Sequence, residues 1–370
     1  MEHIVLVINP GSTSTKLAVY RDERQTHTTS LHHSNQDLAR FSDIEDQKGF
    51  REKVIVEWLE SEDIPLESLT AIVARGGLLA PMPGGTYHVN EVMVQHMAEG
   101  RYGRHASNLA GLIAYDLSQR LGIPAFIVDP VVVDELDPVA RISGNPQVQR
   151  ISIFHALNQR ANGKKAALLL GRPYEELNLI IAHLGGGISV GAHKKGRVVD
   201  VNNALSGEGP FSPERVGSLP SRRLVHYFFD QHWTKGDLMK LFVGRSGLVA
   251  HLGTNDSREI VARMHAGDAD AKFYFQAMCY QIAKEIGRAS TVFCGNVDQI
   301  VLTGGLAHST ELVEELKPRV EFIAPVVVLP GENELEALAF GALRVLRGEE
   351  QARHYAVDGN SEHPAREVKQ

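Results

Sequence analysis

The chain uses one plan twice: an apolar strand, a turn of small residues and a second strand. Residues 4–20 read IVLVINPGSTSTKLAVY, and residues 179–193 read LIIAHLGGGISVGAH. Each copy continues through a charged turn into a third extended segment. Because such turns are rich in backbone N–H groups and hydroxyls, they are suited to binding phosphate. The repeat therefore predicts two like domains that grip a phosphate chain between them.

Strands alternate with helices through the rest of both halves. In the first half we expect strands at 3–10, 16–21, 25–31, 70–77 and 124–130, and helices at 35–61, 90–99 and 107–121. In the second half we expect strands at 178–184, 187–193, 197–202, 299–305 and 324–330, with helices inside 219–292, from 308 and over 333–348. This order predicts the α/β class, with mixed sheets flanked by helices on both faces.

Length and composition indicate how many domains the chain can form, and they disfavour some classes of binding partner. At 370 residues the chain can form two domains with separate cores. Its net charge of −7 favours neither nucleic acid nor a membrane surface, and no apolar run approaches the roughly 18 residues of a membrane span. The start, MEHIVLVINP, has no signal-peptide pattern, so we expect a cytoplasmic protein. Cys279 and Cys294 match no metal-ligand spacing and are expected to be reduced core residues.

The first turn, NPGSTSTK at 9–16, superficially resembles a P-loop but departs from it. A P-loop needs glycine before the lysine and Ser/Thr after it, whereas this segment has Thr15 and Leu17 and continues as a strand. The turn still offers polar groups to phosphate and metal, from Asn9, Ser12, Ser14 and Lys16. The alternative is a polar turn with one solvated lysine.

The second half contains two glycine-rich turns. HLGGG at 183–187 lets backbone N–H groups approach phosphate without an intervening side chain. LTGGLAHS at 302–309 is a strand that ends in two glycines before a helix, which suits a nucleotide. Either turn, taken alone, is also compatible with a purely structural role.

Several charged residues stand at strand ends or helix starts. Arg75 ends a strand, where its planar guanidinium suits a carboxylate or phosphate. Asp129 ends a buried strand before a proline, which favours a functional role. His155, Arg215 and Arg258 could equally be structural residues.

Together and in order, these segments resemble the acetate and butyrate kinase family, within the superfamily that includes sugar kinases, heat-shock ATPases and actin. The resemblance covers about residues 4–348 and rests on INPGSTSTK, ARGG, RHASNLA, IVDPVVVDE, SGNPQVQRISIFHALNQR, HLGGGISVGAH, LTGGLAH and ENELEALA. It is strongest for the butyrate kinase branch. Acetate kinases typically carry HLGNG and a turn resembling GIGEN, so HLGGG and TGGLAH argue against acetate as the preferred acceptor.

The resemblance implies two duplicated domains of the ribonuclease H-like, actin-like ATPase type, each with a mixed five-stranded sheet, and an active site in the interdomain cleft. The predicted N-terminal domain is 1–152 completed by about 337–357, and the nucleotide-binding domain is 153–336. A polar tail is predicted at 358–370. The family also implies a homodimer or a higher homo-oligomer.

The implied activity is the reversible, ATP-dependent phosphorylation of butanoate or another short-chain fatty acid to its acyl phosphate, with ADP as the other product and Mg²⁺ as the cofactor. One alternative is a kinase of the same family that prefers acetate, propionate or a branched acid. A sugar kinase is a second alternative. An actin-like ATP-binding module without acid kinase activity is the alternative from another class.

The resemblance also assigns roles to residues. Asn9 and Glu334 would serve the metal, with Glu332 and Glu336 as alternatives, and Arg75 would bind the carboxylate of the acid. Asp129, His155 and Arg215 would be catalytic. The nucleotide-binding residues would be Ser12, Ser14, Lys16, His183, Gly185, Gly186, Gly187, Asp256, Arg258, Gly304, Gly305 and His308.

Two further expectations follow from the chemistry. A fatty acid with a pKa of about 4–5 is already ionised near neutrality, so Asp129 has no proton to remove. We expect Asp129 instead to orient Arg75 or magnesium-bound water. Residues 131–133 (VVV) either line a pocket for the acyl tail or pack in the core.

Overall fold

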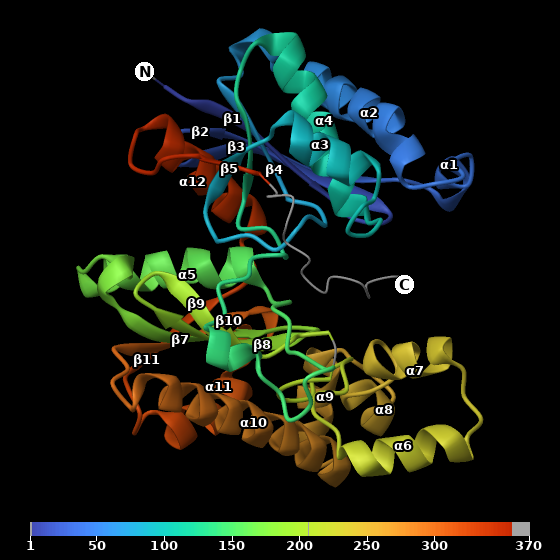
Figure 1. Cartoon of the computed structure of the whole chain (residues 1–370), viewed down its shortest axis with the longest axis vertical. Helices are drawn as coiled ribbons and strands as arrows, with labels where there is room; N and C mark the ends of the chain where they lie inside the picture. The colour runs from blue at the N-terminus through green and yellow to red at the C-terminus, as the bar shows by residue number, and fades with distance from the viewer. Residues whose placement is uncertain (1, 206, 357–370) are drawn as a thin grey trace. The chain divides into compact units, whose positions relative to one another are not determined.

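Figure 1 shows the computed structural model of the chain, which describes residues 2–205 and 207–356. The backbone divides into two compact units. Unit 1 takes in the chain up to Val133 and again from Asn333 on, and unit 2 spans Asp134–Glu332. The polar tail predicted at 358–370 lies outside the described residues.

The first boundary between the units lies earlier in the chain than the sequence predicted. Residues 134–152 were expected in the N-terminal domain, but they pack on the third strand of unit 2. Arg150 donates hydrogen bonds to Asp200 Oδ1 and to the carbonyl oxygen of Val201, each at 2.9 Å. The N–H of Asp137 donates to Val199 O at 2.9 Å. These contacts assign the segment to unit 2.

In the described part of unit 1 the sheet has seven strands in the order β12-β5-β6-β4-β1-β2-β3. The strands are β1 (Ile4–Pro10), β2 (Ser14–Arg21), β3 (Arg24–His32), β4 (Ala71–Ala74), β5 (Thr86–His88), β6 (Ala125–Val128) and β12 (Arg353–His354). Strands β1, β4 and β6 are parallel, whereas β2 and β3 form an antiparallel meander with β1. The predicted five strands become seven because β5 and β12 extend the sheet. These strands of three and two residues are too short to show an alternating pattern.

Helices cover both faces of this sheet (Figure 1). They are α1 (Asn35–Leu38), α2 (Lys48–Ser61), α3 (Glu91–Ala98), α4 (Ala106–Leu121) and α12 (Glu334–Leu346), with short 3₁₀ turns at Glu45–Gln47 and Leu66–Ser68. Leu6 and Ile8 point into the core shared with α2 and α4. Tyr20 points to the opposite face, where its ring contacts Phe340 of α12. Alternation along the strands therefore places Asn9 and Lys16 on the α12 face.

The helix predicted over 35–61 is interrupted. Helix α1 ends at Leu38, and α2 begins only at Lys48. Between them, Asp46 Oδ2 accepts a hydrogen bond from Asp43 N at 3.1 Å. Such local bonds from aspartate to the backbone compete with a continuous helix.

The described part of unit 2 has a five-stranded sheet, as predicted, and its strand order is β11-β10-β7-β8-β9. Its strands are β7 (Asn178–Leu184), β8 (Ile188–Lys194), β9 (Arg197–Val201), β10 (Gln299–Gly304) and β11 (Val326–Pro330). Strands β7, β8 and β9 repeat the antiparallel meander of β1, β2 and β3. Strands β10 and β11 then add in parallel beside β7.

In unit 2, α5 covers one face of the sheet and α10 with α11 covers the other (Figure 1). The helices are α5 (Ala156–Leu170), α6 (Ser221–Asp230), α7 (Lys235–Phe242), α8 (Leu248–Leu252), α9 (Ser257–His265), α10 (Ala269–Ser290) and α11 (Thr310–Val320). The 3₁₀ turns are Pro138–Arg141, Tyr174–Glu176, Thr291–Phe293 and Gly305–His308. The main core lies between the sheet and α10, with Phe275, Met278 and Ile282 buried.

Among the described helices, none is both long and apolar enough to cross a membrane. Cys279 is buried in α10, and burial raises the pKa of its thiol to about 12. Cys294 is exposed, so the expectation that it lies in a core was wrong. It has a φ of 52° at the end of a 3₁₀ turn, where the chain reverses at the surface.

Candidate functional site

The β1–β2 turn presents polar groups at one end of the unit 1 sheet. Gly11 N donates to Ser14 O at 2.8 Å and closes the turn. Ser12 and Lys16 are exposed. Lys16 lies opposite Asn9 in the β1–β2 ladder, so both side chains are on the same face of the sheet. The structure thus brings together the residues that the sequence selected in this turn.

A buried arginine that the sequence analysis did not select, Arg51, binds the backbone of this turn. Arg51 of α2 is 1% exposed. Its guanidinium donates to the turn carbonyls of Gly11, Ser12 and Ser14 at 2.8–3.1 Å. Burial lowers the pKa of Arg51 to about 10. Nothing in REKVIVEWLE distinguishes Arg51 from a surface arginine, so only the fold identifies it.

Three predicted site residues meet at the ends of β1, β4 and the start of α12. Asn9 Nδ2 donates to Glu334 Oε2 at 2.7 Å, and Arg75 lies 3.1 Å from Glu334 Oε1. Arg75 directly follows β4, which runs parallel to β1, so both strands deliver their next side chains to the same edge. Asn9 is 4% exposed, and the Arg75 side chain is 43% exposed.

The oxygen atoms of Asn9 and Glu334 are the ligand type that Mg²⁺ prefers. No group of three or more His, Cys, Asp or Glu side chains suited to a metal gathers within the described ranges. A magnesium ion bound here would therefore complete its coordination with phosphate oxygens and water, as Mg²⁺ commonly does. Glu332 is exposed. Glu336 lies near Tyr20, and burial of the Tyr20 hydroxyl, together with the charge of Glu336, raises the pKa of Tyr20 to about 12. Of the three glutamates considered, Glu334 is the one hydrogen-bonded to Asn9.

Asp129 follows β6 at the same edge of the sheet, with a positive φ of 39°. It is 4% exposed, and its Oδ1 accepts from Gly85 N at 2.7 Å. Gly85 O in turn accepts from Asp129 N at 3.0 Å. The Asp129 carboxylate therefore holds the loop that contains Gly85. Beyond it, Val132 belongs to the core of unit 1 and Val131 packs against that core, which supports the packing interpretation of the VVV run.

His105 is a further residue near Arg75 to which the sequence analysis gave no role. It caps the N-terminus of α4, where its ring nitrogen accepts from Ser107 N. Its pKa is lowered by burial and then by the charge of Arg75. The available signal was the RHASNLA segment, which stands immediately before a helix.

In unit 2 two histidines stack at the glycine turn between β7 and β8. The rings of His155 and His183 are parallel within 12°, with centroids 3.7 Å apart. His183 is the next-to-last residue of β7, and His155 immediately precedes α5. Burial, and then His155, lower the pKa of His183 well below its usual value. His183 is therefore neutral near pH 7.

Arg215 lies on the same side of this turn. A Cβ added to Gly187 would be 3.5 Å from His155 Cε1 and 3.7 Å from Arg215 Nε. Arg215 Nε is buried and has no hydrogen-bond partner among the described residues. The backbone at Arg215 is fixed by Ser212, whose Oγ accepts from Arg215 N at 3.0 Å. A buried, unpaired N–H is costly unless a ligand accepts from it, so this position is suited to an anion.

Glu214 links the glycine turn to the predicted adenosine segment. Its Oε2 accepts from Asn255 Nδ2 at 3.2 Å, and a Cβ on Gly186 would be 3.2 Å from its Oε1. Asp256 caps α9 and pairs with Arg258 at 2.8 Å, with Arg258 90% exposed. Within the described part of the chain, neither Asp256 nor Arg258 forms a hydrogen bond or an ion pair with the glycine turn.

Gly304 ends β10 directly against the same turn. Its φ is +87°, and a Cβ would lie 2.4 Å from Leu184 O. Gly305 and His308 are the two exposed residues of the 3₁₀ turn that follows. The structure thus brings His155, His183, Gly187, Arg215 and Gly304 together, whereas Arg258 and His308 lie at the surface.

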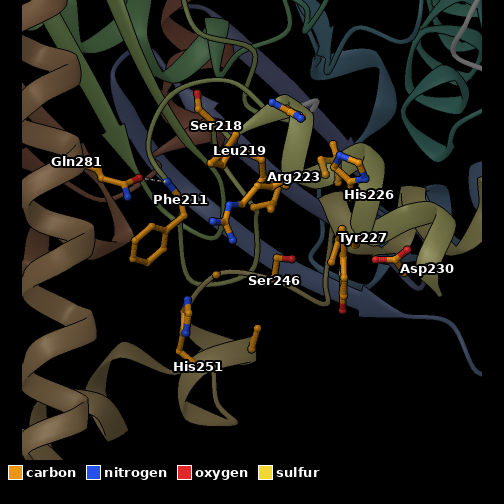
Figure 2. Close-up of a pocket in the computed structure, with 17 residues that line it drawn as sticks. Phe211, Ser218, Leu219, Arg223, His226, Tyr227, Asp230, Ser246, His251 and Gln281 are labelled. Atoms are coloured by element: carbon orange, nitrogen blue, oxygen red, sulfur yellow. Dashed lines mark hydrogen bonds between the residues drawn. The ribbon is translucent and has the colours of Figure 1, made fainter. Parts of the chain in front are cut away.

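A separate cavity of about 1050 Å³ lies elsewhere in unit 2. Figure 2 shows side chains from α6, such as Arg223 and Tyr227, and His251 of α8 around it. Gln281 of α10 closes one side and accepts from Phe211 N at 3.2 Å. No predicted site residue is among the described residues that line this cavity.

Comparison with known proteins finds similarity to one protein family and to several solved structures. Residues 147–325 match the acetokinase family. Three solved structures share the fold. The acetate kinase of Porphyromonas gingivalis has a TM-score of 0.75 at 19% identity, over 92% of this chain and 99% of that chain. A propionate kinase from Francisella tularensis subsp. tularensis SCHU S4 and the acetate kinase of Entamoeba histolytica each have a TM-score of 0.70 at 17% identity, over 91% of this chain and 98% of the other. The predicted actin-like ATPase fold, with two domains of mixed sheets flanked by helices, is confirmed.

Proposed function

We propose that the chain is an ATP- and Mg²⁺-dependent kinase of short-chain carboxylates, with butanoate as the preferred acid, because residues 147–325 match the acetokinase family. The observation that most supports a phosphoryl-transfer site is the unpaired, buried Nε of Arg215 beside His155 and Gly187. A cationic donor and a histidine at a glycine turn suit the oxygens of a phosphoryl group.

The proposed reaction forms a bond between a carboxylate oxygen and the γ-phosphorus of ATP. It breaks the bond between that phosphorus and the bridging oxygen of the β-phosphate, which releases ADP and the acyl phosphate. The acid is already ionised, so no base is required. Both reactants are anions, and the main task of the protein is therefore to position them and offset their repulsion.

We assign the acid to unit 1 residues and the phosphoryl group to unit 2 residues. In unit 1 Arg75 would bind the carboxylate, and Lys16 with the hydroxyls of Ser12 and Ser14 would bind ATP phosphates. Asn9 and Glu334 would hold Mg²⁺, which when bound offsets phosphate charge.

In unit 2 the backbone N–H groups of residues 185–187 would bind phosphate oxygens. His155 and Arg215 would donate hydrogen bonds to the transferring group. Residues 256–258 and 304–308 would surround the adenosine. The interdomain cleft stays a prediction, as does the homodimer, which light scattering of the purified chain would test.

The preference among acids depends on a small difference in binding free energy between acyl chains of different length. Each buried methylene contributes about 0.8 kcal/mol, so two of them favour butanoate over acetate by only about ten- to twentyfold. We therefore propose broad activity on propanoate, butanoate, 2-methylpropanoate and pentanoate, with weaker activity on acetate.

Trapping the acyl phosphate with hydroxylamine tests the proposal directly. The purified chain is incubated with ATP and Mg²⁺ and each two- to five-carbon acid in turn, and the hydroxamate and ADP are both quantified. We expect hydroxamate with every acid and the most with butanoate. ADP released with glucose but without hydroxamate would indicate a sugar kinase. Slow ATP hydrolysis that ignores the acid would indicate a binding module without kinase activity.

A further inference from the structure

A chain of hydrogen bonds runs from the core of unit 2 to His155. Some groups in this chain can only accept a hydrogen bond, and they determine which partner is the donor in the neighbouring bonds. His155 Nδ1 lies 2.8 Å from Ser189 Oγ. Ser189 stands in β8 and is fully buried. The protonation of His155 therefore depends on what the hydroxyl of Ser189 does.

Gln159 of α5 fixes that hydroxyl. Its Nε2 lies 3.0 Å from the backbone oxygen of Ser189 and 2.8 Å from Ser189 Oγ. A backbone carbonyl can only accept, so the NH₂ group of Gln159 must face Ser189. Gln159 Nε2 thus donates to Ser189 Oγ. Among the described residues His155 Nδ1 is the remaining partner of this buried hydroxyl, so the hydroxyl proton is satisfied only by donating to His155 Nδ1.

The other end of the Gln159 amide agrees with this orientation. Its Oε1 lies 2.9 Å from His193 Nε2 and can only accept, so His193 carries its proton on Nε2. His193 is fully buried, and burial followed by the charge of Arg160 lowers its pKa well below its usual value. Its Nδ1 is therefore unprotonated and accepts from Tyr174 Oη at 2.6 Å. Gly191 leaves room for the amide, because a Cβ there would be 2.4 Å from Gln159 Oε1.

The stacked partner of His155 is held in the opposite tautomer. Asn158 Nδ2 donates to the carbonyl oxygens of Gly331 and Glu332, at 3.2 and 2.9 Å. Its Oδ1 therefore faces His183 Nδ1, at 2.8 Å, and requires a proton there. Two parallel rings with opposite tautomers thus stand at the glycine turn.

We propose that Ser189 and Gln159 are positioning residues that hold His155 as the neutral tautomer protonated at Nε2, so that the ring acts as a hydrogen-bond donor and not as a base. At the proposed active site this N–H donates to an oxygen of the transferring phosphoryl group. That role rests on the proposed function, whereas the tautomer itself is a property of the folded chain.

Nitrogen-15 NMR of the histidine rings in the full-length chain tests the tautomer without substrates. The His155→Asn and His183→Asn variants assign the two rings. We expect Nε2 protonated and Nδ1 unprotonated in His155, and the reverse in His183. In Ser189→Ala, His155 should become a mixture of tautomers while His183 is unchanged. Gln159→Met, which keeps the length of the side chain but has no donor, should act in the same way.

Tyr174→Phe is the matched control, because it removes one buried hydrogen bond from the same chain but leaves Gln159 anchored on the Ser189 carbonyl. It should leave the tautomer of His155 unchanged. A wild-type His155 protonated at Nδ1 would overturn the proposal. So would an unaltered Nε2–H tautomer in both Ser189→Ala and Gln159→Met.

Kinetics separates this inference from the proposed function. Removing one positioned donor to a developing anion typically lowers kcat about 10²–10³-fold, so partial loss through Ser189→Ala should lower it about 10–100-fold with little change in KM. Ser189→Thr, which keeps the hydroxyl, should recover part of kcat. If no acid is phosphorylated but the tautomers are as described, the positioning role stands and the proposed activity fails.

Discussion

At the residue scale, the candidate site consists of polar and charged side chains near strand ends in unit 1 and beside the glycine turn in unit 2. Asn9 lies near the end of β1, Arg75 follows the neighbouring parallel strand β4, and Glu334 contacts both from the start of α12. In unit 2, Arg215 presents a buried N–H without a partner among the described residues. Arg215 Nη2 also lies 3.4 Å from Glu214 Oε1, so the guanidinium is partly paired and its buried Nε–H is the atom left to bind an anion.

Replacing Arg215 with alanine should lower kcat far more than it weakens substrate binding. A transition-state arginine can contribute about 10³–10⁵ in rate, so we expect kcat to fall at least about 10³-fold, while the KM for ATP changes only a few-fold. Steady-state kinetics with butanoate measures both values. Arg172→Ala, which removes a partly exposed ion pair with Asp298, is the control and should retain activity. Unchanged kcat in Arg215→Ala would remove this residue from the mechanism.

Asp129→Asn separates the charge of this residue from its structural role. Asparagine tolerates the positive φ and can still accept from Gly85 N, so the free energy of unfolding should stay within about 1 kcal/mol of wild type. If the carboxylate orients Arg75 or magnesium-bound water, kcat should fall about 10–100-fold. Parallel urea unfolding and kinetics measure the two effects. A near-wild-type rate would show that Asp129 serves the loop alone.

At the element scale, each turn of the repeat is supported by a residue from another helix or strand. Arg51 of α2 clamps the β1–β2 turn through carbonyl groups, and the end of β10 packs on the β7–β8 turn through Gly304. The turns therefore depend on partners far away in sequence. The strands and their turns were predictable from the apolar pattern, but these supports were not.

Arg51→Met should both destabilise unit 1 and loosen the β1–β2 turn. The substitution keeps much of the apolar stem but leaves the carbonyls of Gly11, Ser12 and Ser14 without their buried donor. Unsatisfied buried groups cost about 1–3 kcal/mol each, and partial rehydration of this turn limits the total to about 2–4 kcal/mol. Urea unfolding measures the loss. Lys53→Met in the same helix, where Lys53 makes an exposed pair with Glu57, should change stability by less than about 0.5 kcal/mol.

Gly304→Ala should disrupt the junction between β10 and β7. The added Cβ would lie 2.4 Å from Leu184 O at a backbone φ of +87°, so both the contact and the conformation are strained. We expect a loss of more than about 2 kcal/mol in the free energy of unfolding. Gly305→Ala is the matched control, since nothing lies within 4 Å of its added Cβ. Equal stabilities of the two variants would contradict the close approach.

At the scale of the whole molecule, both units bury histidines in the neutral form. Six histidines in the described part of the chain have a lowered pKa, for which burial is the largest cause in each case: His33, His88, His96, His105, His183 and His193. Their shared preference for the neutral ring couples folding to pH.

The chain should lose stability as the pH falls from about 6.5 towards 4. Burial lowers the pKa of His33 to about 4, so between these values the unfolded chain binds a proton that the folded chain does not. The free energy of unfolding therefore falls with pH, by at most about 3 kcal/mol from His33 alone. Urea midpoints measured from pH 7.5 to 5 test this. His33→Gln should flatten the profile, whereas the substitution of its exposed neighbour, His32→Gln, should not; parallel profiles would contradict the role of His33.

The amino-acid sequence by itself determined the repeated meander, the parallel strands after it and the residues of both turns, because apolar alternation and small-residue turns are local signals. The tertiary structure decided what distant segments contribute: the Arg51 clamp, the choice of Glu334 over Glu332 and Glu336 as the partner of Asn9, the assignment of residues 134–152 to unit 2, and the buried chain from Tyr174 to His155. The physical reason is that burial and hydrogen-bond direction depend on neighbours that only the folded chain brings together. A buried arginine or glutamine has the same local sequence pattern as an exposed one.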